Sequence, residues 1–352
     1  MSRRSIASIL AVVLLVGLWF AGTQVRSGYV VFSPGPTINV LGHFDGKPIL
    51  QVSGHRVYRD KGGLRMVTVS PTGPGDNVNM LAVVRAWADP TRAVYPYTAV
   101  YAPSDTQRSV QQQSTEEMVS SQDAAVANAL RALHIPFDNA VKIAGVEAKG
   151  PSAGKLRKGD LVLAVDGHRV HSTRQLIARI GPRQPGSVVR LEIRRGHRTR
   201  TVAITTVRST QKGTKSAIRV LVAPSYDFPF HVGVHISPNI GGPSAGLMFS
   251  LSIYDILTPG SLTHGKVVAG TGEISPDGAV GEIGGIQQKI VGAQHDGAHL
   301  FLVPAKNCAE ALGAAYDPEK IRLVKVSRFS DALADVKAWA ADPQARLPRC
   351  TR

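Results

Sequence analysis

The chain begins with an uncharged apolar run, SIASILAVVLLVGLWFAG, from Ser5 to Gly22, directly after Arg3 and Arg4. A run of this length is sufficient to cross the hydrocarbon layer of a bilayer. It is longer than the apolar region of about 7–15 residues in a secretory signal peptide, and no clear A-x-A cleavage site follows it. We therefore expect a retained membrane anchor, with a cleaved signal peptide as the alternative.

The basic residues on the short N-terminal side indicate which way the anchor lies. Because cytoplasmic flanks tend to be basic, we expect a single-pass cell-membrane protein whose body beyond about Gly22 is extracytoplasmic. The net charge of +16 suits a protein that lies beside an anionic bilayer, and the sequence shows no nucleic-acid-binding module. Membrane lipid is therefore an expected partner, and nucleic acid is not.

The chain has two cysteines, Cys308 and Cys350, both close to its C-terminal end. In an oxidising compartment such a pair is a disulfide candidate that would pin the C-terminal tail. Two free thiols remain the alternative, because sequence separation says nothing about geometry. We expect neither a metal site nor a cofactor.

The pattern of elements predicts four segments. Residues 1–27 form a cytoplasmic stub and the anchor, and residues 28–122 form an N-terminal extracytoplasmic region. In that region YVVFSPGPTINV and LRMVTVS are typical of strands, and DNVNMLAVVRAWAD is typical of a helix. A further helix, SSQDAAVANALRALHI, is expected to begin at a cap on Ser120 or Ser121 and to lead into the next domain.

Residues 123–210 alternate strands with one helix, STRQLIARI, for which Ser172 is the expected N-cap. The segment resembles a PDZ domain in its turn residues: Gly150-Pro151-Ser152-Ala153-Gly154, Leu156, Gly159-Asp160, Val165-Asp166-Gly167, Val170 and Pro185-Gly186. The resemblance implies a β-rich domain that binds peptide C-termini by strand addition, with a carboxylate-binding loop near Ile135 to Phe137. Ser152 is expected to lie in an ordinary turn, beside solvated lysines that are poor bases.

The peptide GPSAG occurs again at Gly242 to Gly246, between a strand and a helix. Ser244 would then lie at a helix N-terminus, where unpaired backbone N–H groups can stabilise an oxyanion. Its base is one of three candidates: His231, His235 or a lysine whose pKa is lowered by burial. Lys289 is the candidate lysine, because it lies close to the border of the apolar stripe of the helix predicted at about residues 285–296. A surface lysine that buries only its aliphatic stem is the alternative at this position.

Residues 211–352 resemble the proteolytic domain of the Lon protease family. The matching motifs are GPSAG at 242–246, Ala269-Gly270-Thr271-Gly272-Glu273-Ile274 with Gly278, Ile283-Gly284-Gly285-Ile286 with Lys289, and Leu302-Val303-Pro304. The resemblance implies Ser244 as nucleophile, Lys289 as general base and Thr271 as a residue that orients the lysine. Gly242 supports the turn, and Gly241-Gly242 stands where the family has Asp-Gly. The fold class expected for the chain is α/β (α+β).

The stretch GSLTHGKV at 260–267 has the glycine and lysine spacing of a phosphate-binding loop, but Val267 replaces the required Ser or Thr. No ATPase module precedes the last domain. The combination resembles bacterial membrane-anchored, PDZ-containing Lon-type peptidases, which implies ATP-independent cleavage of unfolded extracytoplasmic polypeptides and assembly into a homo-oligomer. The alternative is an inactive PDZ scaffold that binds peptides at the membrane surface.

Overall fold

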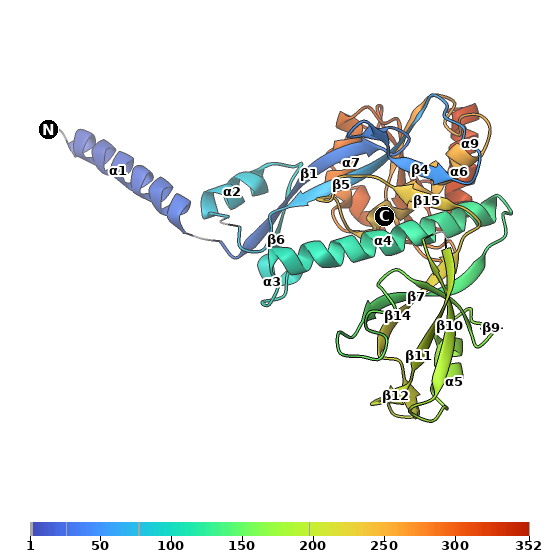
Figure 1. The fold of residues 1–352 in the computed structure, drawn as a ribbon. Helices are drawn as coiled ribbons and strands as arrows, with labels where there is room; N and C mark the ends of the chain where they lie inside the picture. The colour runs from blue at the N-terminus through green and yellow to red at the C-terminus, as the bar shows by residue number, and fades with distance from the viewer. Residues whose placement is uncertain (1–2, 26, 77, 197, 352) are drawn as a thin grey trace. The chain divides into compact units, whose positions relative to one another are not determined.

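The computed structural model describes residues 3–25, 27–76, 78–196 and 198–351 (Figure 1). The chain forms two compact units. One is discontinuous and contains the residues up to Leu133 together with those from Val232 onward. The other, His134–His231, is inserted between these two parts. We call them the discontinuous unit and the inserted unit. The mixture of helices and strands confirms the expected fold class.

A six-stranded sheet forms the centre of the discontinuous unit, in the order β20-β19-β16-β5-β1-β6. The strands are β1 (Tyr29–Asn39), β5 (Gly63–Pro71), β6 (Ala93–Pro96), β16 (Val267–Gly270), β19 (Leu300–Pro304) and β20 (Arg322–Val326). β5 pairs in parallel with β16, while β1 pairs antiparallel with both β5 and β6. The N-terminal strands thus complete a sheet that the C-terminal strands begin. This differs from the separate region expected at residues 28–122, because β5 pairs with β16 in one sheet.

Helices cover both faces of this sheet. The main ones are α4 (Gln107–Ala132), α6 (Gly246–Leu257), α7 (Ile286–His295) and α9 (Phe329–Ala341), and α2 (Met80–Ala88), α3 (Tyr97–Val100) and α8 (Cys308–Ala311) are shorter. Ala269 of β16 shares a buried cluster with Ile286 and Ile290 of α7. The next residue, Gly270, lies against Met248 of α6. Because successive strand residues point to opposite faces, α6 and α7 lie on opposite sides of the sheet.

α4 begins earlier than the sequence suggested. Its N-cap is Thr106, which forms a capping box with Ser109, and the helix continues through Ser120 and Ser121. The expected cap at Ser120 or Ser121 is therefore wrong. The stronger cap upstream allowed the polar stretch between residues 107 and 119 to join the same helix.

The inserted unit has its own sheet, in the order β11-β10-β8-β7-β14. Its elements are β7 (Asp138–Val146), β8 (Leu161–Val165), β9 (His168–Arg169), α5 (Thr173–Ile180), β10 (Val188–Arg195), β11 (Arg198–Thr205), β12 (Val207–Arg208), β13 (Ser216–Ala217) and β14 (Val220–Asp227). Ser172 caps α5 by accepting a hydrogen bond from Gln175 N, as expected. β14, which we had assigned to the last domain, instead pairs with β7, so the unit extends past residue 210.

The first GPSAG copy forms a turn in the inserted unit. Ser152 is fully buried, and its Oγ donates a hydrogen bond of 2.6 Å to the carbonyl oxygen of Ile218. Gly154 has a φ of +72°, which favours glycine. Ser152 thus has a structural role, as expected, and its hydroxyl is buried in the turn.

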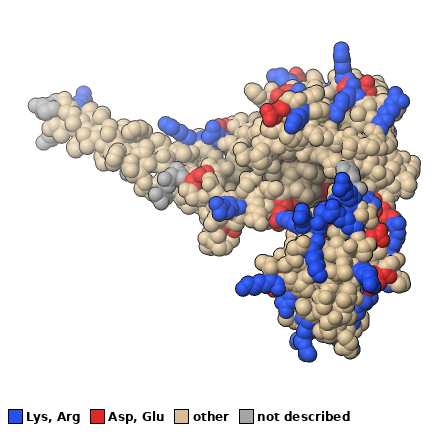
Figure 2. All heavy atoms as spheres, viewed as in Figure 1, with Lys and Arg blue, Asp and Glu red and all other residues tan. Residues whose placement is uncertain are grey.

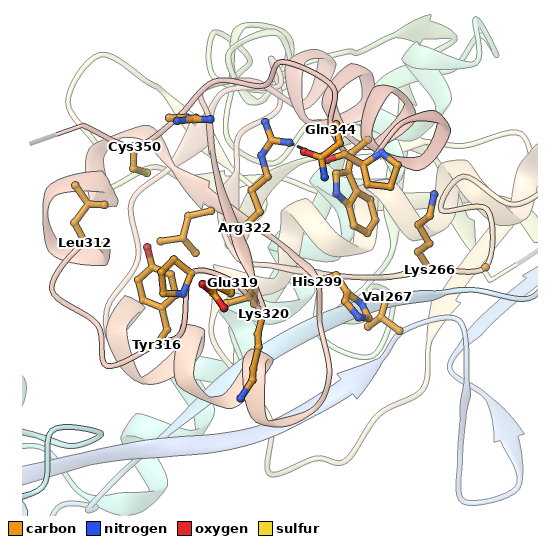
Figure 3. A pocket seen from close by; sticks show the side chains of 17 residues that line it. Lys266, Val267, His299, Leu312, Tyr316, Glu319, Lys320, Arg322, Gln344 and Cys350 are labelled. Carbon is orange, nitrogen blue, oxygen red and sulfur yellow. Dashed lines mark hydrogen bonds between the residues drawn. The ribbon is translucent and has the colours of Figure 1, made fainter.

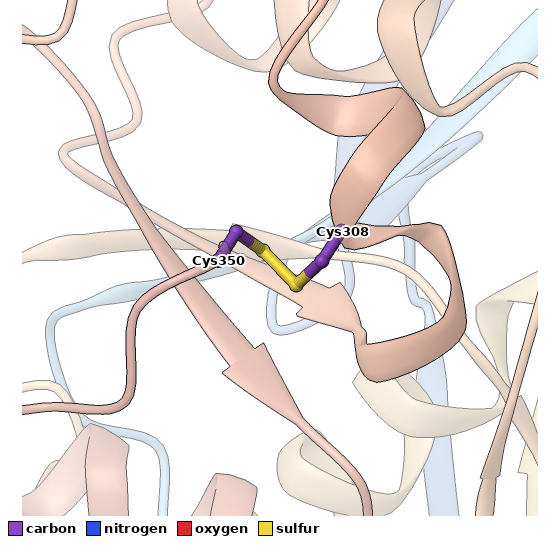
Figure 4. The surroundings of a disulfide bond; sticks show 2 residues. All are labelled: Cys308 and Cys350. Atoms are coloured by element: carbon purple, nitrogen blue, oxygen red, sulfur yellow. A yellow bond between two sulfur atoms is a disulfide. The ribbon is translucent and has the colours of Figure 1, made fainter. Parts of the chain in front are cut away.

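The described residues also contain short strand pairs: β12 with β13, β2 (His43–Phe44) with β3 (Lys47–Pro48), β4 (Leu50–Ser53) with β15 (His231–Val234), and β17 (Glu273–Ile274) with β18 (Val280–Gly281). A disulfide joins Cys308, at the start of α8, to Cys350 in the tail (Figure 4). The two Cα atoms are 5.0 Å apart.

The helix α1 (Arg3–Gln24) contains the apolar run. Residues Arg4–Gln24 are long and apolar enough to span a membrane, a property that a signal sequence near the N-terminus shares. Figure 2 shows the surface along α1 without charged residues beyond its first turn.

Candidate active site

Ser244 lies in a short 3-10 turn, Pro243–Ala245, that runs directly into α6. The turn depends on the glycines before it. Gly242 has a φ of +86°, which side chains other than glycine rarely adopt. A Cβ on Gly241 would lie 2.6 Å from Ser114 Cβ and 3.1 Å from its backbone. The two glycines therefore let the turn approach α4 closely.

α4 holds this turn in place through two hydrogen bonds. The N–H of Gly242 donates to the carbonyl oxygen of Ser114 at 2.8 Å. The buried hydroxyl of Ser121 donates to the carbonyl oxygen of Pro243 at 2.9 Å. Sequence reasoning missed both serines. The small residues of this part of α4 were the available signal, because they allow another backbone to come close.

Lys289 reaches Ser244 from α7. Its Nζ lies 2.9 Å from Ser244 Oγ and 3.2 Å from Thr271 Oγ1. The side chain is only 2% exposed, with the fully buried Ile286 and Ile290 on the same helix. The structure thus brings together the serine, lysine and threonine that the sequence singled out, from segments up to 45 residues apart.

Thr271 links the lysine to the serine backbone. It follows β16 and is fully buried. Its Oγ1 donates to the carbonyl oxygen of Ser244 at 3.0 Å, and the N–H of Gly272 donates to the same oxygen at 2.8 Å. With its proton directed at that carbonyl, Thr271 Oγ1 offers a lone pair to the Lys289 amine. The threonine therefore limits where the amine can point.

Burial lowers the pKa of Lys289 from 10.5 to about 7. Desolvation is the cause, because a charged amine loses its hydration in an apolar interior. A large part of the lysine is therefore neutral near pH 7, and a neutral amine can accept a proton. Desolvation alone lowers the pKa of Lys289, without a neighbouring acid, which fits the glycines at 241 and 242.

The two candidate histidines do not replace the lysine. The ring of His235 packs beside the ring of Phe44, with centroids 5.6 Å apart, and the backbone N–H of His235 donates to the carbonyl oxygen of Ile49 at 2.7 Å. His231 is exposed. Among the residues that the structure describes, Lys289 is the titratable group within hydrogen-bond distance of Ser244 Oγ.

Asn307 is a further residue that sequence reasoning missed. It is 5% exposed, accepts a hydrogen bond from Ile283 N at 2.9 Å, and donates one to Ile283 O at 2.9 Å. Ile283 lies just before α7, so this pair of bonds fixes the chain that leads into the Lys289 helix. The disulfide at Cys308 adjoins Asn307 in sequence.

A separate cavity of about 930 Å³ lies beside β20 and the C-terminal tail (Figure 3). Its lining includes Arg322, Lys266 and Cys350, and none of Ser244, Thr271 or Lys289. Arg322 donates to the carbonyl oxygens of Pro343 and Ala345. Lys266, the lysine of the GSLTHGKV stretch, donates to the carbonyl oxygen of Ala340. Lys266 thus holds the end of α9 and Arg322 holds the segment after it, so both cations are engaged with backbone carbonyl oxygens.

The inserted unit has a groove of its own, a cavity of about 560 Å³ lined by α5 and β14. Two of its apolar side chains are open to solvent: Leu221 is 72% exposed and Ile177 is 43% exposed. β14 is an edge strand of the sheet. The loop near residues 135–137, where we expected carboxylate binding, does not line this groove. Phe137 packs instead against the rings of Tyr226 and Phe228.

Comparison with known families gives two matches. Residues 114–206 match the model of the PDZ domain, and residues 197–336 match the model of the Lon protease (S16) C-terminal proteolytic domain. The first match begins inside α4 and ends before β14, and the second begins one residue before β11. Neither model therefore includes the strands β1, β5 and β6 that complete the discontinuous unit.

Curated relatives match about a third of the chain. A Lon protease of Methylocella silvestris is 37% identical over 119 residues, which are 33% of this chain and 14% of the relative. A Lon protease of Campylobacter concisus is 39% identical over 117 residues, 33% of this chain and 12% of the relative. The chain thus spans about an eighth of the length of these relatives.

Among solved structures, the PDZ domain of an SdrC-like protein from Listeria monocytogenes is 23% identical. The match covers 24% of this chain and 86% of that chain, with a TM-score of 0.22.

Proposed function

We propose that this chain, a PDZ-containing Lon-type serine peptidase, is anchored in the cell membrane by α1 and cleaves unfolded polypeptides outside the cytoplasm without ATP. Ser244 is the nucleophile and Lys289 the general base in this proposal. The observation that carries it is the 2.9 Å separation of Lys289 Nζ and Ser244 Oγ at a buried position. A buried amine with a pKa of about 7 is suited to deprotonate a serine near neutral pH.

The reaction proceeds by acyl transfer. Neutral Lys289 takes the proton of Ser244 as Oγ bonds to the scissile carbonyl carbon, and the resulting ammonium returns a proton to the leaving amine. Water then attacks the acyl carbon as Lys289 takes its proton. The C–Oγ bond breaks as the ammonium gives this proton to Ser244 Oγ, which releases the second product and restores both residues. Backbone N–H groups near Ser244 stabilise the oxyanion, and Pro243, at the start of the turn, has no N–H to contribute. The N–H of Gly242 is not one of them, because it donates to Ser114.

The inserted unit supplies the peptide-binding function in this proposal. An edge strand beside an apolar groove favours strand addition, in which a peptide pairs with β14 and places side chains against α5. We expect the groove to take the C-terminal ends of polypeptides. Ile177→Glu places a charge on its exposed apolar wall and should weaken peptide binding at least tenfold in fluorescence anisotropy. Unchanged affinity would place the peptide elsewhere.

Cleavage is tested with the full-length protein in lipid nanodiscs and a labelled disordered polypeptide, without nucleotide. We expect cleavage by the native protein and its loss in Ser244→Ala and Lys289→Ala. Persistent cleavage by the Ser244 variant would refute the assignment. A requirement for added ATP would refute ATP independence alone.

A serine-directed boronate or phosphonate probe gives an independent test of Ser244. The probe should label the native protein and should not label Ser244→Ala. It should also label Ser152→Ala, because this control variant keeps Ser244 in the pentapeptide at residues 242–246. Peptide binding without either labelling or cleavage would instead support the inactive PDZ scaffold.

A further inference from the structure

α2 presents a stripe of large apolar side chains to solvent. Its inner face, with Val83 and Ala86, packs into a small buried cluster that includes Val31 and Val78. On the outer side the exposed fractions are 38% for Met80, 53% for Val84 and 82% for Trp87. The spacing of four and three residues places these three side chains on one side of the helix. We call them the α2 stripe.

The α2 stripe lies beside the end of the apolar helix α1. The N–H of Met80 donates to the carbonyl oxygen of Val25 at 3.2 Å, and Ser27 donates to the carbonyl oxygen of Val78 from both its N–H and its Oγ, each at 2.8 Å. Gly22 lies close to Leu81, whose Cβ is 3.9 Å from the position a Cβ would take. These contacts tie the start of α2 to the last turn of α1, where an uncharged run of chain ends.

We propose that the α2 stripe is inserted into the interfacial layer of the bilayer that α1 crosses. This rests on the proposed role of α1 as an anchor. An apolar surface continuous with a membrane-spanning helix is held at the boundary between headgroups and acyl chains. Amphipathic helices bind there through one apolar face, and tryptophan is enriched at this depth.

The charge of α2 fits the same occupant. Arg85 is the helix's single charged residue and is exposed next to Val84. An arginine near the surface of an anionic leaflet is attracted to lipid phosphates. With α1 and α2 both held by lipid, the sheet is attached to the membrane at two points, because α2 packs on β1 through Val31.

The three tryptophans of the chain allow a direct test. Trp19 belongs to α1, Trp87 to the α2 stripe, and Trp339 to the core of α9, where it is 4% exposed. Three full-length variants each retain one tryptophan and carry phenylalanine at the other two positions. Each is reconstituted in vesicles of phosphatidylcholine and phosphatidylglycerol, with or without bromine atoms on the acyl chains just below the headgroups.

We expect brominated lipid to reduce the emission of Trp87 at least twofold, to quench Trp19 as well, and to leave Trp339 unchanged. Val84→Glu in the Trp87 variant should remove most of the quenching. Val84 is exposed, so the change should leave the fold intact. Unchanged Trp339 emission, when Val84→Glu is added to the Trp339 variant, checks this.

The outcomes separate the inference from the anchor. Quenching of Trp19 without quenching of Trp87 would overturn the inference while α1 remains a membrane span. Emission from Trp87 that is shielded from iodide but insensitive to brominated lipid would also overturn it, since a second copy or another protein would then cover the stripe. Unquenched Trp19 would contradict the anchor itself and the inference with it.

Discussion

Replacing Lys289 with methionine removes a buried amine and leaves an unbranched side chain of similar volume. The change should abolish cleavage, because the base is lost. It should also stabilise the fold. The amine is 2% exposed, and burial lowers its pKa from 10.5 to about 7, so the folded state disfavours the charged form that the unfolded chain prefers.

The size of the effect follows from this difference in pKa. A change of one pKa unit corresponds to about 1.4 kcal/mol, so the penalty on the folded state is about 5 kcal/mol below pH 7 and about 4 kcal/mol at about pH 7.5. Methionine also loses the two hydrogen bonds to Ser244 and Thr271, each contributing about 1 kcal/mol. The net gain in the free energy of unfolding is then about 2 kcal/mol at about pH 7.5.

The penalty on the folded state decreases as the pH rises. Between pH 7 and 10.5 the unfolded chain binds more protons at Lys289 than the folded chain, so the stability of the native protein rises with pH. At about pH 9 the penalty has fallen to about 2 kcal/mol, and the advantage of the methionine variant should be close to zero. Lys320→Met, at a side chain that is 71% exposed, is the matched control and should not change this profile.

Thermal unfolding of the full-length protein in nanodiscs, followed by tryptophan emission, measures the effect. The inserted unit contains no tryptophan, so the signal comes from the other parts of the chain. A gain of about 2 kcal/mol should raise the melting temperature by about 4–8 °C at about pH 7.5. A lower melting temperature for Lys289→Met, or an advantage that does not shrink by about pH 9, would refute the view of Lys289 as a desolvated, mainly neutral base.

Three further predictions concern the same unit. The kcat/KM of the native protein should fall tenfold per pH unit below about 7 and level off above it, as the neutral fraction of Lys289 does; a flat profile in a rate assay across this range would contradict the assigned base. Asn307→Ala should lower the free energy of unfolding by about 1–3 kcal/mol and reduce kcat more than it raises KM, because Ile283 before α7 is released. Gly241→Ala should reduce the cleavage rate at least tenfold, because its Cβ clashes with Ser114. Adding Ser114→Gly should restore part of the rate. No recovery in the double variant would contradict the clash with Ser114 as the cause.

The sequence alone predicted the features that depend on local pattern and local chemistry. The apolar run of α1, the Ser172 cap and the glycine-rich turn before Ser244 are each encoded in a few neighbouring residues. The helix that carries Lys289 was also predicted to within one residue at each end. Family resemblance, and not pattern, singled out Lys289 from other lysines, because its position at the border of an apolar stripe also suits an exposed residue.

Pairing between distant segments was decided by the tertiary structure. No pattern in the neighbouring residues indicates that β5 pairs with β16, which follows the inserted unit in the sequence. The same is true of β14, which completes the sheet of that unit. The same holds for Ser114 and Ser121, which contact the serine turn from more than 100 residues away. A strand or helix can bury its apolar face against many partners, and the partner is selected only when all segments pack together. The sequence by itself therefore determined which groups are available for chemistry. The packing determined the burial that lowers the pKa of Lys289, because desolvation depends on every segment around it.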